Sequence, residues 1–116
     1  MLFIEYPKCT TCIKAKRYLE SKKIEFVDRN IKIDNPTKEE IITWHKMSNL
    51  PIKKLFNTSG LLYKEYDLKN KLDNMSEEEM YNLLSTNGML VKRPILVTNE
   101  KAIFGFKVDE WDKLIK

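Results

Sequence analysis

The first thirty residues alternate between apolar runs and one stretch with helical spacing. Leu2–Tyr6 is a short apolar and aromatic run ended by Pro7, which is typical of a strand. Ile24–Ile31 has the same character. Between them, Thr10–Ser21 predicts a helix with its apolar positions at Cys12, Ala15 and Leu19. We therefore expect a β-α-β unit with parallel strands and a right-handed crossover.

The middle of the chain has helical signals only. Thr37 and Glu40 form one capping box, Ser76 and Glu79 form another, and apolar residues with helical spacing follow each. Pro51–Phe56 and the stretch from Asp67 to Leu72 read as short helices around a turn at 57–60. About sixty residues is too long for a structureless loop in a compact domain, so we expect an all-helical insertion over about 32–90.

The end of the chain returns to strands. Ile95–Thr98 and Ala102–Phe106 predict a hairpin that turns at 99–100. A final helix should follow, with an apolar stripe of Val108, Trp111, Leu114 and Ile115. The predicted fold class is α/β in one domain over 1–116. Its β-α-β…β-β-α core covers about 1–31 and 91–116, and the helical insertion separates the two halves.

Composition narrows the functional classes. The 116 residues carry 21 Lys and Arg against 17 Asp and Glu, a net charge of +4. The lysines are interleaved with acids, which indicates a solvated surface rather than a nucleic-acid interface. No apolar run approaches the roughly 18 residues that span a bilayer, and the first residues do not resemble a secretory signal. We expect a monomeric cytoplasmic protein without direct contact to membrane or nucleic acid.

The two cysteines stand three positions apart where the first helix should begin. A C-x-x-C pair near a β-α-β unit is typical of thioredoxin-like redox motifs. Helix-start amides favour a thiolate at Cys9, and Cys12 lies one turn later on the same face. Residues i and i+3 lie within disulfide range, so Cys9 could attack and Cys12 could resolve the mixed disulfide. Lys8, Lys14 and Lys16 add positive charge.

Other uses of these residues stay open at this point. The pair could be half of a zinc site, but there is no second C-x-x-C and His45 is the only histidine. The cysteines could also be inert core residues, which suits Cys12 better than Cys9. A phosphatase-like loop is excluded, because the residue six after Cys9 is alanine. We expect His45 to be a surface residue rather than a general base, and Trp44 and Trp111 to belong to the core.

Arg93–Pro94 is the second informative pair. A proline before a strand cannot donate to the ladder and belongs at the first position. X-Pro bonds are also where cis peptides occur. A cis turn here could bring Arg93 close to a helix-start thiolate, where its guanidinium would stabilise the thiolate or hold an oxyanion.

Four motifs together resemble the ArsC/Spx family of arsenate reductases and redox-sensing regulators, in particular its YusI-type branch. They are the segment 7–15, the turn at 57–60, the segment 92–97 and the I-F-G-F run at 103–106. The resemblance runs nearly end to end. It implies a thioredoxin-like fold, a cis-proline at Pro94, a Cys9–Cys12 redox disulfide and a catalytic role for Arg93. It implies no bound cofactor or metal, only an external thiol such as glutathione with glutaredoxin, or thioredoxin.

The sequence departs from both known activities of that family. The two other oxyanion-binding arginines of the reductases fall near Asn57 and Phe106, so we expect weak arsenate reduction. The regulators carry a glycine where this chain has Leu50, and they continue beyond the position of Lys116. We predict a thiol–disulfide oxidoreductase acting on a partner protein or a small thiol. The alternative is an Spx-like regulator that contacts the RNA polymerase α-subunit.

Overall fold

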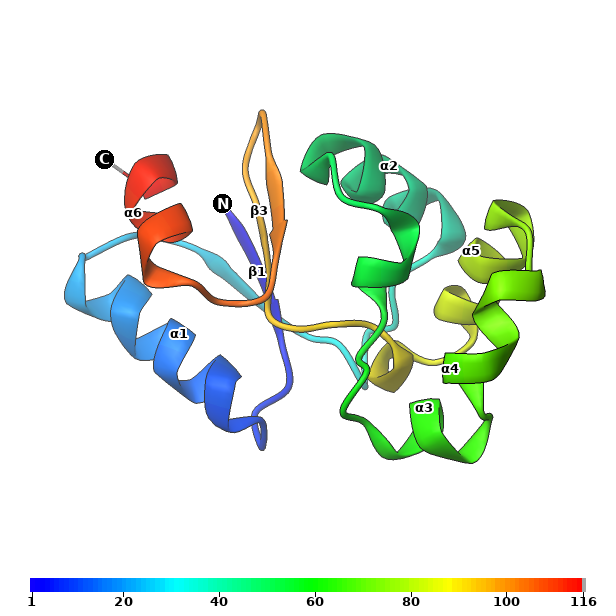
Figure 1. The fold of residues 1–116 in the computed structure, drawn as a ribbon. Helices are drawn as coiled ribbons and strands as arrows, with labels where there is room; N and C mark the ends of the chain where they lie inside the picture. The colour runs from blue at the N-terminus through cyan, green and yellow to red at the C-terminus, as the bar shows by residue number, and fades with distance from the viewer. Residues whose placement is uncertain (116) are drawn as a thin grey trace.

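The computed structural model describes residues 1–115 as a four-stranded sheet with helices on both faces (Figure 1). In chain order the elements are β1 (Leu2–Glu5), α1 (Thr10–Ser21), β2 (Val27–Asn30), α2 (Lys38–Ser48), η1 (Ile52–Leu55), α3 (Leu61–Glu65), α4 (Leu68–Lys71), η2 (Leu72–Asn74), α5 (Glu77–Thr86), η3 (Gly88–Leu90), β3 (Ile95–Val97), β4 (Ala102–Phe104) and α6 (Val108–Ile115). None of the helices within these residues is both long and apolar enough to cross a membrane.

The sheet has the strand order β2-β1-β3-β4. Strand β1 is parallel to β2, with Leu2 opposite Val27, and antiparallel to β3. Strands β3 and β4 form an antiparallel hairpin in which Leu96 lies opposite Ile103. The predicted parallel β-α-β unit and the C-terminal hairpin are both confirmed. Strands β2 and β4 are the two edges of the sheet.

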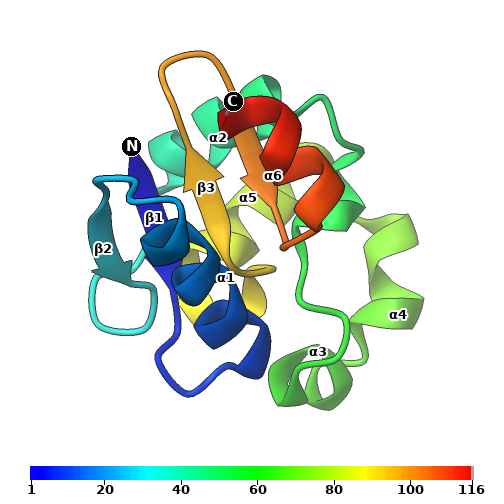
Figure 2. The same cartoon turned by 90° about the vertical axis from the view of Figure 1, so that its left-hand side faces the viewer.

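Helices α1 and α6 cover one face of the sheet (Figure 2). Their core is a buried cluster centred on Trp111, which packs on Phe3 of β1 with ring centroids 6.3 Å apart. Trp111 is fully buried, as predicted for the core. The prediction for Val108 is wrong, because Val108 is 48% exposed. It is the first residue of α6, and the helix turns its apolar face to the sheet only from Trp111 onward.

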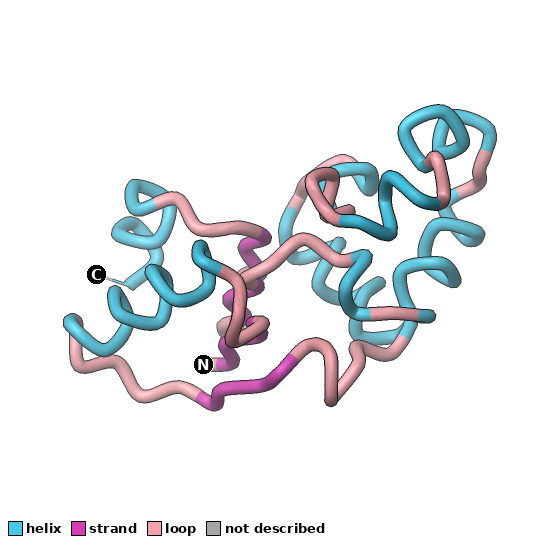
Figure 3. The backbone as a smooth tube through the Cα atoms, turned by 90° about the horizontal axis from the view of Figure 1, so that it is seen from below, coloured by secondary structure: helices cyan, strands magenta, loops and turns pink. Residues whose placement is uncertain are grey.

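The helices between β2 and β3 cover the opposite face, so that the strands lie between two groups of helices (Figure 3). A larger hydrophobic core joins Ile4 and Ile95 of the sheet to Ile41, Trp44 and Leu84 of these helices. The segment is not purely helical, because Phe56 and Val91 pair through an isolated antiparallel bridge. Helix α3 and the turn η3 have no counterpart in the sequence prediction. They are short and lack a helical repeat.

Both predicted capping boxes are present. The Thr37 hydroxyl accepts from the N–H of Glu40, and the Glu40 carboxylate accepts from the N–H of Thr37. Ser76 and Glu79 do the same at the start of α5. Because these contacts join residues only three apart, they depend on local sequence alone.

Strand ends differ from the predicted ones. Strand β2 begins at Val27 instead of Ile24, because Ile24 and Phe26 pack against the core around Trp111 before the strand starts. Strand β4 ends at Phe104, because Gly105 has a φ of +90° that turns the chain out of the sheet. A side chain at that φ would be strained, which explains the glycine. Beyond this turn the ring of Phe106 packs against Tyr18 of α1, with ring centroids 5.6 Å apart.

Candidate active site

Cys9 is the N-cap residue of α1. Its extended backbone leads into the helix, and its N–H donates to the carbonyl of Tyr6 across 2.9 Å. Its Sγ accepts from the N–H of Cys12 at 3.4 Å. The side chain is partly exposed. A sulfur at this position receives the helix-start amides that stabilise negative charge.

Cys12 lies one turn further along α1 and is almost completely buried, at 1% exposure. Its Sγ accepts from the N–H of Tyr6 at 3.5 Å. Burial raises the pKa of the Cys12 thiol to about 12, and the neighbouring Arg93 charge offsets only part of this effect. Both cysteines are free thiols. The sequence therefore placed the two sulfurs together correctly, and the structure adds that they differ sharply in accessibility.

Arg93 reaches the same place from the end of the insertion. The Arg93–Pro94 bond is cis, the geometry that the resemblance implies. The guanidinium lies over the ring of Tyr6, 5.4 Å from its centroid, and donates weakly to the carbonyls of Met89 and Val91 at 3.4 and 3.5 Å. Its Nε is buried and has no hydrogen-bond partner within residues 1–115. The Arg93 cation is thus held near the cysteines and keeps an unused hydrogen-bond donor at Nε.

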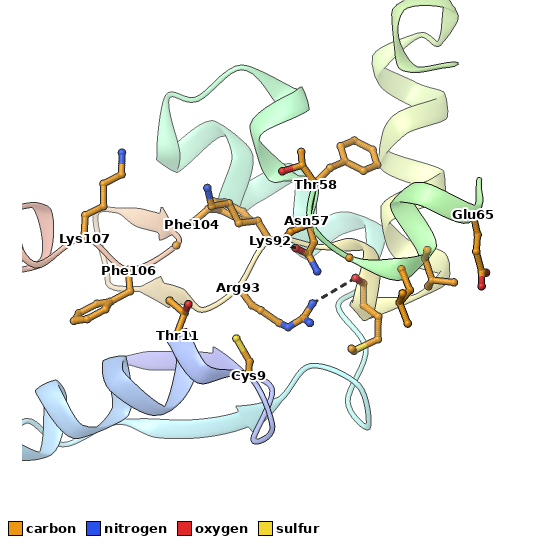
Figure 4. Close-up of a pocket in the computed structure, with 17 residues that line it drawn as sticks. Cys9, Thr11, Asn57, Thr58, Glu65, Lys92, Arg93, Phe104, Phe106 and Lys107 are labelled. Atoms are coloured by element: carbon orange, nitrogen blue, oxygen red, sulfur yellow. Dashed lines mark hydrogen bonds between the residues drawn. The ribbon is translucent and has the colours of Figure 1, made fainter. Parts of the chain in front are cut away.

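Cys9 and Arg93 open into a cavity of about 740 Å³. In Figure 4 the sulfur of Cys9 points toward the Arg93 side chain, which extends across the pocket in the direction of Asn57. The insertion supplies one wall through residues 56–62, and the turn after β4 supplies the other through residues 104–107. Cys12 is not part of the lining. The pocket is therefore assembled from four segments that lie far apart in the sequence.

Asn57 and Phe106 both line this pocket. The family resemblance implies that the two missing arginines of the arsenate reductases would lie near these residues. The cations that line the pocket, within the described part of the chain, are Arg93, Lys92 and Lys107. Because Asn57 is a neutral amide and Phe106 an aromatic ring, an anion in this pocket would meet fewer charged donors than it would with arginines at these two places.

The three lysines expected to add positive charge near Cys9 are not among the residues that line its pocket. Lys16 pairs with Asp28 of β2 at 2.8 Å, on the sheet side of α1. Lys8 and Lys14 do not line the pocket, whereas Lys107 does and was missed. Nothing near Lys107 in the sequence indicated this, because Lys107 joins the pocket lining only through the turn at Gly105.

A buried carboxyl group lies beneath α1. Glu5 ends β1 and is 5% exposed, although its sequence neighbourhood reads as an apolar strand. Burial, followed by a hydrogen bond to Asp28, raises the pKa of Glu5 to about 7. Burial alone would raise the pKa of Asp28 as well, but the hydrogen bond from Glu5 and the ion pair with Lys16 hold it below its usual value. Sequence reasoning missed Glu5 altogether.

His45 is not a freely exposed residue, so that prediction is corrected. It is half-buried, with Nδ1 2.5 Å from the Tyr81 hydroxyl and Nε2 2.7 Å from the carbonyl of Leu50. These contacts tie α2 to α5, away from the cysteines. Trp44 is core, as predicted. Residues 1–115 contain no group of three or more histidine, cysteine or acidic side chains arranged to hold a metal.

Known proteins resemble this chain in both sequence and fold. A sequence model of the ArsC family matches residues 4–114. The uncharacterized protein YusI of Bacillus subtilis is 45% identical over 113 residues, which are 97% of this chain and 96% of YusI. The regulatory protein MgsR of the same organism is 33% identical over 116 residues, covering all of this chain and 90% of MgsR.

Solved structures give the same picture. An ArsC family related protein from Bacteroides fragilis superposes with a TM-score of 0.95 at 54% identity, covering 97% of this chain and 95% of that one. Spx regulators and arsenate reductase-like structures are among the further matches.

Proposed function

Because the chain belongs to the ArsC family, we propose that it is a thiol–disulfide oxidoreductase in which Cys9 attacks and Cys12 resolves. The observation that carries the proposal is the asymmetry of the two sulfurs. Cys9 caps a helix and opens into a pocket, whereas Cys12 is buried one turn behind it. Because exchange depends on access to the attacking thiol, this asymmetry suits Cys9 to the attack and Cys12 to the resolving step.

The first step is attack by the Cys9 thiolate on a substrate disulfide. A bond forms between Cys9 Sγ and one substrate sulfur, the substrate S–S bond breaks, and the other sulfur leaves as a thiolate that takes up a proton. The helix-start N–H groups and the Arg93 guanidinium stabilise the anionic sulfur in the pocket.

The second step is attack by Cys12 on Cys9. Cys12 loses its proton as its sulfur bonds to Cys9 Sγ, and the substrate leaves as its second thiol. The substrate disulfide is reduced to two thiols while Cys9 and Cys12 become a disulfide. Burial raises the pKa of the Cys12 thiol to about 12, so Cys12 enters this step as a thiol. An external dithiol, or two equivalents of a thiol such as glutathione, would reduce the enzyme again.

Mass spectrometry tests this proposal. The oxidised wild-type protein should lose two hydrogens, and a thiol reductant should restore them. With a small aryl disulfide, the Cys12→Ser protein should accumulate one adduct on Cys9, because nothing resolves it. The Cys9→Ser protein should form no adduct at neutral pH. If both cysteines stay free after oxidation, or only intermolecular dimers form, the proposal is wrong.

A regulatory role is the second candidate, favoured by the full-length match to the regulatory protein MgsR. In that case the same cysteines would sense oxidation and the protein would contact the RNA polymerase α-subunit. Pull-down with purified α-subunit, using the reduced and the oxidised protein, separates the two roles. Redox-dependent capture without disulfide turnover would favour the regulator.

A further inference from the structure

A second cavity, of about 510 Å³, lies along strand β4. All three residues of β4 line it, and so does Leu50 from the segment after α2. Helix α6 forms its other side. Strand β4 is an edge of the sheet, and no described strand pairs with its outer side. Edge strands present unpaired backbone N–H and C=O groups to whatever lies beside them.

Five lysines and a single acid line this β4 groove. The lysines come from η1, the segment before β3, the β3–β4 turn, the turn after β4 and α6, and they are Lys54, Lys92, Lys101, Lys107 and Lys113. The acid is Glu110. The ion pairs formed by residues 1–115 use none of these five lysines. For a chain whose net charge is only +4, this is a strong local excess of unpaired positive charge.

The β4 groove adjoins the Cys9 pocket. Lys92, Phe104 and Lys107 line both cavities. Gly105 permits this junction, because a Cβ on Gly105 would come within 2.9 Å of the Lys92 Cε. The stem of Lys92 thus lies against the glycine backbone at the boundary between the two cavities. A ligand bound in the groove would extend toward the sulfur of Cys9.

We propose that the partner of Cys9 is a protein segment in which acidic residues flank the reacting cysteine, bound in extended form along β4. This rests on the proposed thiol–disulfide function and names its substrate class. An extended chain satisfies the free edge of β4 through backbone hydrogen bonds, and acidic side chains match the lysines. The groove has the volume of a small-ligand site, which suits a few residues of extended chain.

The chemistry is the exchange described above with a peptide as substrate. The Cys9 thiolate attacks the sulfur of the peptide cysteine, and the thiol that was paired with that cysteine leaves with a proton. Cys12 then displaces the peptide as a free thiol. Acidic flanks raise the rate of the first step by concentrating the peptide at the groove, without changing the bonds that form.

Three peptides of equal length test the proposal. Each carries one cysteine as a mixed disulfide with 2-thiopyridine, followed by four glutamates, four glutamines or four lysines. Release of thiopyridone follows the reaction at Cys9. Since electrostatic steering raises association rates by 10-fold or more, we expect the glutamate peptide to react about 10-fold faster than the glutamine peptide at low salt. Added salt should reduce this ratio toward one.

Lysine variants test whether the preference for the glutamate peptide arises in the β4 groove. Lys54, Lys101 and Lys113 are exposed and line only the β4 groove, so the triple change to glutamine should bring the glutamate-to-glutamine rate ratio close to one. The matched control changes three exposed lysines that line neither cavity, Lys32, Lys46 and Lys69, to glutamine. It carries the same net charge and should keep the ratio. Circular dichroism checks that both proteins are folded.

A peptide that binds but cannot react with Cys9 tests the docking site independently, by NMR spectroscopy. A glutamate peptide with serine in place of cysteine should shift the amide resonances of Ala102, Ile103 and Phe104. Shifts confined to other elements would overturn the proposal. So would a short DNA oligonucleotide that binds this groove more tightly than the glutamate peptide, because the groove would then belong to a nucleic acid.

The outcomes separate the two proposals. If all three peptides release thiopyridone at one rate, or if the control triple variant loses the preference as fully as the groove variant, the acidic partner is wrong and the redox function stands. If no peptide releases thiopyridone, the redox function fails, and the partner proposal fails with it.

Discussion

The backbone N–H of Cys12 donates to the Sγ of Cys9 across 3.4 Å, while the side chain of Cys12 itself is buried. One turn of helix therefore gives the two sulfurs opposite environments. The sulfur of Cys9 faces the open pocket and accepts a hydrogen bond from a helix-start amide, whereas the sulfur of Cys12 is enclosed by protein. This difference, more than the spacing of the pair, assigns their roles.

Alkylation should report that difference. Burial raises the pKa of Cys12 to about 12, and each pKa unit above the solution pH lowers the thiolate fraction about tenfold. At pH 8 we expect iodoacetamide to modify the Cys12→Ser protein much faster than the Cys9→Ser protein, and the slow reaction of Cys12 should keep rising with pH. Rates followed by mass spectrometry from pH 6 to pH 10 check this. Equal rates on the two variants would contradict the assignment.

The buried carboxyl of Glu5 should make stability depend on pH. In the unfolded chain Glu5 loses its proton near its ordinary value of 4.5, whereas in the folded protein it keeps the proton up to about pH 7. Protonation of Glu5 thus favours folding; its contribution is complete below about pH 4.5 and is lost as the pH rises through 7.

Glu5→Gln mimics the protonated form and removes this titration. We compare the free energy of unfolding of the variant with that of the wild type at each pH. This difference should be about 1–2 kcal/mol more favourable to the variant at pH 8 than at pH 5. Urea unfolding at the two pH values measures the difference. Glu100→Gln, an exposed change in the β3–β4 turn, should show no such pH dependence. If the stability of both variants relative to wild type changes by the same amount between pH 5 and pH 8, Glu5 does not have the raised pKa and the prediction is wrong.

Arsenate reduction should be weak in the wild-type protein. A dianionic oxyanion needs several charge-assisted donors, and the pocket has Asn57 and Phe106 near the two places where the family resemblance implies arginines in the reductases. A coupled assay with arsenate and either glutaredoxin or thioredoxin measures turnover. The Asn57→Arg and Phe106→Arg double variant should lower the KM for arsenate. Robust wild-type turnover that disappears in Cys9→Ser would show that Arg93 and the lysines suffice.

Trp111 should contribute strongly to the stability of the fold. It is fully buried, and its indole N–H donates to the carbonyl of Gly105 at 3.1 Å. Trp111→Phe removes that hydrogen bond and leaves a cavity, so we expect a loss of about 2–4 kcal/mol in the free energy of unfolding. Leu61→Ala, at a side chain that is 79% exposed, should cost less than about 0.5 kcal/mol. Urea unfolding of both variants measures the contrast.

Much of the architecture was readable from the sequence because it depends on near neighbours. Helix α1 has the predicted bounds, Thr10–Ser21, since its apolar repeat and its capping residue lie within one segment. The capping boxes at Thr37 and Ser76 are equally local. The parallel β-α-β unit followed from two apolar runs around one helix.

The site was readable only in part. The C-x-x-C spacing determines that Cys9 and Cys12 meet, because residues one helical turn apart are always neighbours. Arg93 was placed near them by its proline and by family resemblance. The burial of Glu5 could not be inferred, since a carboxylate inside an apolar strand gives no sign of the Asp28 and Lys16 that lie beside it.

Tertiary structure alone decided the two cavities. Their walls come from η1, the turn after β4 and α6, which are separated from Cys9 by more than forty residues, and their lysines show no periodic spacing along the chain. Periodicity and capping record contacts within a few residues, whereas a groove is defined by which distant segments pack together. The sequence therefore determined which sulfurs can react with each other, and the packing of the insertion and α6 on the sheet determined what surrounds them.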